Sequence, residues 1–229
     1  MNRDRTFFAL GGIAAVTTAA TTFLLWWLPQ QYSSPTTIEE TMALHATAPY
    51  MARLWVNYIH VFLALFAYAA AAWAVRLQAP IAATVGFVAF LFWCLAEAIG
   101  VSINIWAVNG DWRAAYGAAD EAERELIRAS IHTFQGLWNG IFFVVLTTFL
   151  IGTMSYAVAL FRKSALQKTL AILFFLAAPL TIIIIADGYF GASLSHWIEW
   201  SYPVLQPVSR ALLGLWLILT AIKPPTLRT

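Results

Sequence analysis

The sequence predicts an all-α polytopic membrane protein, a bundle of six transmembrane helices, because it is rich in apolar residues and they gather in long runs. Of its 229 residues, 61% are hydrophobic and 10% are charged, whereas a soluble domain usually carries about 25% charged residues. About 20 apolar residues suffice to cross a bilayer core, and six runs have roughly that length. Open strands cannot satisfy their backbone in lipid, so each run is expected to be a helix.

The breaks between the runs place the helices in order along a single membrane domain, 1–229. The first run follows a charged start and exceeds the apolar region of a signal peptide, roughly 7–15 residues, so we expect a retained helix. Basic turns, "RLQAP" and "RKSALQK", separate the second helix from the third and the fourth from the fifth. "AADEAERELIRAS" should extend the fourth helix beyond the hydrocarbon. The predicted helices cover about 7–28, 54–76, 81–106, 119–161, 169–187 and 204–222.

The basic residues predict the orientation of these helices. Cytoplasmic loops carry an excess of Lys and Arg, and one side of the predicted bundle holds eight of the 13 basic residues with Asp4 as its single acid. These eight residues are Arg3, Arg5, Arg76, Arg162, Lys163, Lys168, Lys223 and Arg228. Both termini are therefore expected in the cytoplasm. The long acidic, Trp-rich loops are expected on the periplasmic or extracellular side of an inner (plasma) membrane.

Several classes of chemistry are excluded by what the sequence lacks. The net charge is only +2 and no block of basic residues suggests nucleic acid as a partner. Cys94 is the only cysteine, so there is no disulfide framework and no thiolate cluster. No predicted span contains a lysine for a retinal Schiff base. Phosphate-loop, nucleophile-elbow and His-Glu-x-x-His motifs are also absent.

Polar residues recur at helical spacing near the outer ends of three predicted spans. In the fourth helix they are spaced 4, 3 and 4 apart, and in the second helix 4 and 3 apart, so each set shares one face. Glu97 and Asn104 share a face of the third helix. The full set is Arg53, Asn57, His60, Glu97, Asn104, Arg128, His132, Gln135, Asn139 and Asp187, joined by Gln206 and Arg210 at the start of the last span.

These stripes predict a polar pocket that opens to the outside. A charged group facing lipid costs about 2.5–3.5 kcal/mol even on the lenient insertion scale, so the stripes should face one another. Arg128 and His132 would then lie near the mouth, with His60 and Glu97 at the floor. Gly136 and Gly140 form a Gly-x-x-x-Gly pair, which permits close helix approach.

The same residues leave several roles open. His60, Glu97 and His132 could hold zinc, copper or iron, which imidazole and carboxylate groups suit. A haem between His60 and His132 is conceivable, as is acid–base chemistry by Glu97 with His60. The asparagines and glutamines could instead be interhelical hydrogen bonds, worth about 0.6 kcal/mol each. The arginines could reach the lipid headgroups.

The stretch "HTFQGLWNGIFFVVL…GTMSYAVALFRKSALQKTLAILFFLAAPLTIIIIADGYF" resembles a bacterial six-helix membrane family that is catalogued as domain of unknown function 4386. The likeness lies in a His-led helix, a short basic turn, an apolar helix that ends near a small-residue turn, and a final helix. It implies six helices and a bacterial inner membrane. It implies no activity.

Together these observations favour an integral membrane protein that binds a small or lipidic ligand in an outward-facing polar pocket, as a receptor, carrier or accessory subunit. The first alternative is a membrane-embedded enzyme that uses the His/Glu cluster for metal or acid–base chemistry. The second is a scaffold subunit whose aromatic loops meet a membrane protein partner. The expected surroundings are a lipid bilayer.

Overall fold

A computed structural model describes residues 3–161, 164–194 and 198–222, and these residues form helices without a strand. Six long helices follow one another: α1 (Arg3–Trp27), α3 (Ala48–Val75), α4 (Pro80–Ile103), α6 (Glu121–Leu160), α7 (Ala165–Phe190) and α8 (Ile198–Ile222). Shorter elements connect them: η1 (Leu28–Gln31), α2 (Ile38–Ala43), η2 (Leu44–Ala46), η3 (Asn104–Trp112) and α5 (Arg113–Tyr116). The described chain is therefore all-α, as the apolar runs predict.

Six helices of the described chain are long and apolar enough to cross a membrane, which is the architecture of a multi-pass membrane protein. The third of them continues past its predicted end near residue 106, because the π-helical segment η3 joins α4 to α5 without a break. The fourth, α6, has 40 residues and rises about 1.5 Å per residue, so it is roughly twice as long as a span needs. Its first turns extend it beyond the apolar run.

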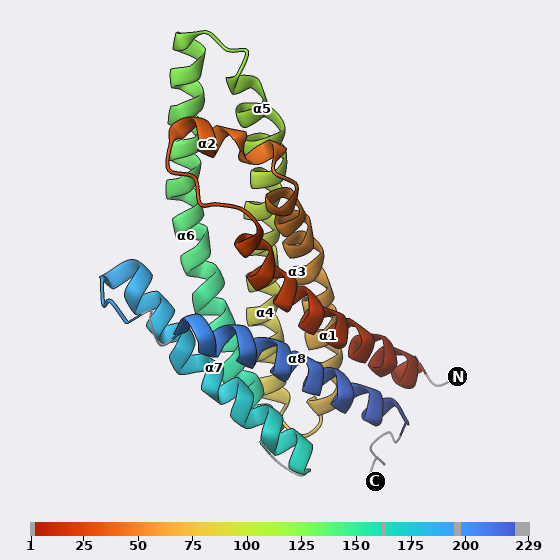
Figure 1. The fold of residues 1–229 in the computed structure, drawn as a ribbon. Coiled ribbons are helices and arrows are strands. Elements are labelled where there is room, and N and C mark those ends of the chain that lie inside the picture. The colour runs from red at the N-terminus through yellow and green to blue at the C-terminus, as the bar shows by residue number, and fades with distance from the viewer. Residues whose placement is uncertain (1–2, 162–163, 195–197, 223–229) are drawn as a thin grey trace.

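The six long helices pack as a closed ring in chain order. Each helix packs against the next, and α8 returns to α1. Figure 1 shows α1, α7 and α8 running obliquely across α3, α4 and α6. At one end, here called the long-loop end, lie α2, α5 and the start of α6. At the other, the short-turn end, lie the turns that join α3 to α4 and α6 to α7.

Charge differs between the two ends among the described residues. Arg76 lies at the short-turn end, where it approaches Asp4 at 4.0 Å, and Lys168 follows the second short turn. Glu40 and Glu121 lie at the long-loop end. Arg3 and Arg5 lie at the start of α1, and the other four basic residues of the predicted cytoplasmic side, Arg162, Lys163, Lys223 and Arg228, lie outside the described residues.

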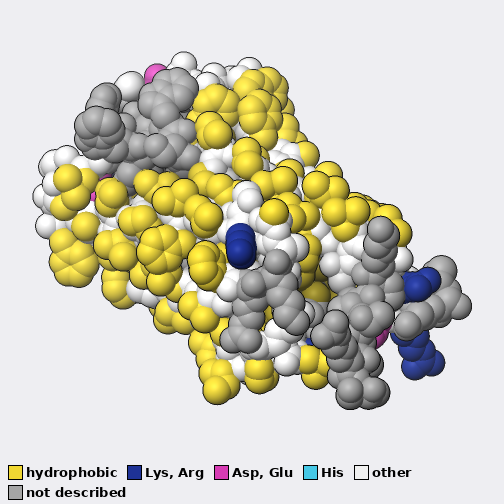
Figure 2. Space-filling model, turned by 90° about the horizontal axis from the view of Figure 1, so that it is seen from below, with side chains coloured by type: hydrophobic (Ala, Val, Ile, Leu, Met, Phe, Trp, Pro, Cys, Tyr) yellow, Lys and Arg dark blue, Asp and Glu magenta, His cyan; other side chains and the backbone are white. Residues whose placement is uncertain are grey.

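Apolar side chains cover the outer surface of the ring, as contact with lipid requires. Large exposed hydrophobic residues occur on each membrane-spanning helix, for example Phe92 on α4, Ile151 on α6 and Phe175 on α7. Figure 2 shows such side chains spread over one face of the molecule, with few Lys and Arg among them. Exposed apolar area of this extent is what a lipid bilayer would cover around a multi-pass membrane protein.

Close helix approach occurs at other glycines than the predicted pair. A Cβ at Gly12 would lie 2.9 Å from the Gly214 carbonyl oxygen, and one at Gly214 would lie 2.7 Å from the Gly12 carbonyl oxygen. The backbones of α1 and α8 therefore meet directly. A Cβ at Gly136 or Gly140 would have no neighbouring atom within 4 Å, so the expected Gly-x-x-x-Gly contact is not made among the described residues.

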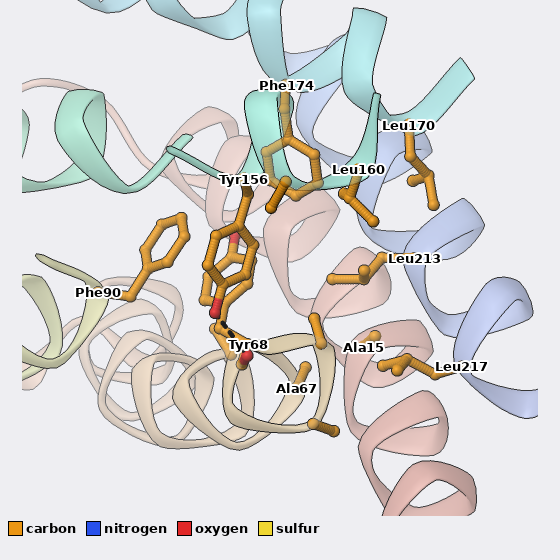
Figure 3. Packing of buried hydrophobic residues seen from close by; sticks show 14 of the residues in the cluster. Ala15, Ala67, Tyr68, Phe90, Tyr156, Leu160, Leu170, Phe174, Leu213 and Leu217 are labelled. Atoms are coloured by element: carbon orange, nitrogen blue, oxygen red, sulfur yellow. Dashed lines mark hydrogen bonds between the residues drawn. The ribbon is translucent and has the colours of Figure 1, made fainter. Parts of the chain in front are cut away.

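The densest packing lies in the short-turn half of the ring. The rings of Tyr68 and Phe90 stack with centroids 3.7 Å apart, and the Tyr156 hydroxyl donates to the Tyr68 carbonyl oxygen at 2.7 Å (Figure 3). Gly86 faces the Tyr156 ring and Gly152 faces the Phe90 ring, where a Cβ would collide. The aromatic rings fill this half, whereas the half nearer the long-loop end contains a cavity.

Candidate functional site

A cavity of about 340 Å³ lies inside the ring, in the half nearer the long-loop end. Its volume falls at the lower end of the range for small-molecule sites, about 300–1,000 Å³. All six long helices contribute to its wall. The polar lining consists of Thr22, Asn57, His60, Glu97, Gln206 and Arg210, and the apolar lining of Leu25, Trp26, Trp93, Phe142, Val145, Leu146, Phe149, Ile184 and Pro203. We call it the Arg210 cavity.

The hydrogen bonds of His60 define its tautomer. The Arg210 guanidinium meets the Nε2 atom of His60, and the Thr21 hydroxyl meets its Nδ1 atom at 2.6 Å. A guanidinium can only donate, so Nε2 accepts and the ring proton is assigned to Nδ1, which donates to Thr21. This arrangement joins α8, α3 and α1 through one buried imidazole, which is only 3% exposed.

Arg210 is a buried cation with an unused donor. Its residue is 5% exposed, and within the described part of the chain its Nε atom has no hydrogen-bond partner. Gln206, one turn earlier on α8, is also buried and lines the same cavity. A buried N–H without a partner costs about 1–3 kcal/mol, so the cavity presents a donor that an acceptor group would satisfy.

Glu97 lies in the same cavity but is not paired with Arg210. Its Oε1 atom accepts from the Asn57 side-chain amide at 3.0 Å. No side-chain nitrogen of Arg210 comes within 4.0 Å of a Glu97 oxygen in the described structure. The cavity therefore holds a carboxyl group and a guanidinium that are separated from one another, in a mostly apolar wall.

A second cavity of about 170 Å³ lies next to the first and nearer the long-loop end. Its lining includes Arg53, Asn104 and Trp138, and Asn57 lines both cavities. We call it the Arg53 cavity. Because Asn57 also bonds to Glu97, this one side chain separates the exposed Arg53 from the interior.

The predicted site residues divide into two groups. The structure brings together Asn57, His60 and Glu97 in the Arg210 cavity, and Arg53, Asn57 and Asn104 in the Arg53 cavity. Gln206 and Arg210 also line the Arg210 cavity, whereas Arg128, His132, Gln135, Asn139 and Asp187 line neither cavity. Asp187 accepts from the Leu194 backbone N–H at 2.6 Å, where the chain leaves α7.

The polar residues of α6 do not line either cavity. His132, Gln135 and Asn139, here called the α6 stripe, are exposed on the outside of the chain. Arg128 bonds to the Tyr116 hydroxyl at 2.8 Å and pairs with Glu125 at 2.9 Å, beyond the apolar part of the helix. The shared face of the stripe is as predicted, but it points away from the ring.

The metal ligands considered from sequence are not assembled. His132 is exposed on α6 while His60 and Glu97 lie inside the ring. Among the described residues, no three His, Cys, Asp or Glu side chains lie close enough to hold a metal ion. The same separation of the two histidines does not fit a haem held between them.

A second buried arginine lies at the long-loop end. Arg113 is 6% exposed, and its Nη1 atom donates to the Tyr50 hydroxyl and to the Asn109 side-chain oxygen, both at 2.9 Å. Asn109 in turn donates to the Asn104 carbonyl oxygen at 2.7 Å. We call this set the Arg113 network. It ties the π-helical segment η3 to the start of α3.

Sequence reasoning did not identify several residues of the Arg210 cavity. Thr21 and Thr22 stand in an apolar run with several other threonines, so nothing distinguishes them. Trp26 and Trp93 are indistinguishable from interfacial or core tryptophans. The sequence does indicate Gln206 and Arg210, because their four-residue spacing places both on one face of the last helix.

Comparisons with protein-family models, with curated proteins and with solved structures find no match to this chain. The resemblance of spans four to six to the six-helix membrane family therefore stays a prediction. The function has to be argued from the cavity itself.

Proposed function

We propose that this membrane protein binds a small or lipidic ligand in the Arg210 cavity, as a receptor, a carrier or an accessory subunit. The observation that carries the proposal is the Nε donor of Arg210, buried without a partner beside a cavity of about 340 Å³. Buried donors are usually hydrogen-bonded, and here the free donor borders a cavity from which a ligand could supply the acceptor. Apolar walls with a few convergent polar groups are the usual composition of a small-molecule site.

We also propose that the long-loop end faces the periplasm or the cell exterior, in a bacterial inner membrane. The basic residues of the short-turn end support this orientation. The Arg53 cavity would then lie on the route from that side to the Arg210 cavity. In intact cells, a membrane-impermeant maleimide should label Glu39→Cys and not Lys168→Cys, each in a Cys94→Ala background. The reverse labelling would overturn the orientation.

The test of ligand binding compares a cavity-filling variant with a matched control. Leu146 lines the cavity, whereas Ile151 on the same helix is exposed to the surroundings. Mass spectrometry of organic extracts should find a small molecule near one per chain in the wild type and in Ile151→Trp. Leu146→Trp should lose it while remaining monodisperse and folded. Equal amounts in all three proteins, or none in any, would contradict the proposal.

The scaffold alternative is favoured by one separate feature. The α6 stripe is exposed, and the space around Gly136 and Gly140 is open. Polar and small residues are the ones through which membrane helices associate. Fixed co-purification of another membrane protein, lost in Gly136→Ile/Gly140→Ile, would support this role. The enzyme alternative has no comparable feature among the described residues.

A further inference from the structure

We infer that the ligand of the Arg210 cavity is dipolar: it carries an anionic oxygen for Arg210 and an ammonium group for Glu97, on an apolar body. This inference deepens the proposed function and rests on it. The shared chemistry belongs both to free amino acids with large apolar side chains and to the headgroup of phosphatidylethanolamine.

The first feature is the separation of a guanidinium and a carboxyl group in one cavity. Arg210 and Glu97 both line it, yet no nitrogen–oxygen pair between them is within 4.0 Å. Removing an ion from water costs several kcal/mol even after relaxation, and a partner must compensate that cost. A direct ion pair would do so, but the two side chains are held apart. A ligand with both charges can compensate each of them at once.

The second feature is how the two groups are held. His60 accepts from Arg210 and is itself fixed by Thr21, so the guanidinium is anchored at one nitrogen while its Nε remains free. On the other side, Asn57 donates to one Glu97 oxygen. Asn57 and His60 lie almost one turn apart on α3. Each charged group therefore has a neutral partner that orients it and does not neutralise it.

The third feature is the rest of the wall. Trp26 and Trp93 contribute aromatic surface, and Phe142, Leu146 and Phe149 contribute an apolar side from α6. The described lining contains no other charged residue than Glu97 and Arg210. A ligand that is charged overall would leave one of these two uncompensated. A ligand without net charge, with an apolar body, matches the whole wall.

The experiment uses four probes that differ only in their charged ends: L-phenylalanine, 3-phenylpropanoate, phenethylamine and propylbenzene. Binding to the full chain in nanodiscs of phosphatidylglycerol is measured by titration calorimetry, with empty nanodiscs as the blank. Hydrogen bonds to charged groups are worth enough to change affinity by about tenfold or more. Phenylalanine should therefore bind at least about tenfold more tightly than either singly charged probe.

Variants show whether the two ends meet the assigned residues. In Glu97→Gln, phenylalanine and 3-phenylpropanoate should bind with similar affinity, because the ammonium group has lost its partner. In Arg210→Met, phenylalanine and phenethylamine should become similar. Glu125→Gln, which changes an exposed acid on α6, should leave the wild-type ranking intact.

A further arm distinguishes the two sources of the ligand. In nanodiscs that contain phosphatidylethanolamine, a lipid ligand would compete with phenylalanine and would be retained in native mass spectra. A free ligand would leave phenylalanine binding unchanged by this lipid. Either result agrees with a dipolar ligand.

The outcomes separate the two proposals. If a singly charged probe or propylbenzene binds the wild type as tightly as phenylalanine, the cavity binds ligands but the dipolar assignment is overturned. If the ranking is unaffected by Glu97→Gln, the assignment is overturned as well, and the wild-type series still decides should this variant not fold. If no probe binds and no lipid is retained, the dipolar assignment is overturned, and the extracts of the wild type and Leu146→Trp decide the proposed function separately.

Discussion

Two arginines are buried to the same degree in this chain, and they differ in what surrounds them. Arg113, 6% exposed, donates to a tyrosine hydroxyl and an asparagine oxygen and lies 5.4 Å from the Tyr50 ring centroid. Arg210, 5% exposed, meets one imidazole and otherwise faces a cavity. Both have an Nε atom without a partner, but only Arg210 has empty space and an acidic side chain across from it.

The surroundings of a buried arginine distinguish a structural residue from a ligand-binding one. Arg113 is enclosed by protein, and its network connects η3 with α3, so its removal should affect folding. Arg210 contributes one interhelical contact and a free donor, so its removal should affect binding more than folding. Burial alone does not separate the two roles, whereas the identity of the neighbouring groups and the adjacent volume do.

The largest effect on stability is expected from Arg113→Met. The substitution leaves the Tyr50 hydroxyl and the Asn109 oxygen without their buried donor, at about 1–3 kcal/mol each, so the free energy of unfolding should fall by about 2–6 kcal/mol. Denaturant titration in detergent micelles measures this change. Arg124→Met is the control, because Arg124 is only partly buried, and it should cost less than about 1 kcal/mol. If both variants lose the same free energy of unfolding, Arg113 does not have the structural role assigned to it.

A smaller change in stability is expected from Arg210→Met. Only the Nε2 acceptor of His60 loses a partner, and the cavity accepts an apolar side chain, so the cost should be about 1 kcal/mol. The same variant should lose phenylalanine binding by about tenfold or more, whereas Arg113→Met should retain it. The distinction between the two arginines is wrong if Arg210→Met lowers the free energy of unfolding as much as Arg113→Met does. It is also wrong if the two variants bind phenylalanine equally.

The sequence indicates the residues of the Arg210 cavity better than it indicates the burial of Arg113. The apolar runs predict six helices, and the cost of a charge in lipid predicts that polar residues turn inward; Asn57, His60 and Glu97 line the Arg210 cavity. Arg113 stood in an apparent loop, because a π-helical continuation of α4 leaves no mark in apolar periodicity. Its burial could not be anticipated.

The α6 stripe shows where the same reasoning stops. Helical spacing establishes that His132, Gln135 and Asn139 share a face, but not which way the face points. The Tyr189 hydroxyl near the end of α7 donates to the Asn139 carbonyl oxygen, so the two helices end their contact at this level. Residues earlier in α6 lie beyond the neighbouring helix. Polar residues there need not turn inward to avoid lipid.

A still smaller effect tests the anchoring of His60. Thr21→Val removes the acceptor of the Nδ1 proton at nearly constant volume, and interhelical hydrogen bonds in membranes average about 0.6 kcal/mol. Thr17→Val is the matched control on the same helix, because the exposed Thr17 hydroxyl donates only to the Ile13 carbonyl oxygen of its own helix. Denaturant titration should find a loss near 0.6 kcal/mol for the first variant and a smaller one for the second. Similar values for both would argue against the hydrogen bond between Thr21 and His60.

The smallest effect concerns pH at the long-loop end. The Glu40 carboxylate accepts from the Thr36 backbone N–H, the Thr36 hydroxyl and the Thr37 backbone N–H, and these bonds hold its pKa below the ordinary value of 4.5. A lowered folded-state pKa contributes stability that is present above the unfolded-state value and is lost as pH falls through the folded-state value. The capped helix is α2, whose Met42 packs in one cluster with Tyr116 of α5.

Glu40→Gln should therefore lower the unfolding midpoint slightly at pH 7, and the gap from the wild type should close as the pH falls below 4.5. Thermal unfolding in detergent across this range measures the gap, and Glu39→Gln on the same helix serves as the control. Because Glu40 is at the surface, salt should weaken the contribution. No residue of α2 lines the Arg210 cavity, so phenylalanine binding should not change in Glu40→Gln. A change in phenylalanine binding would show instead that α2 at the long-loop end and the Arg210 cavity are energetically coupled.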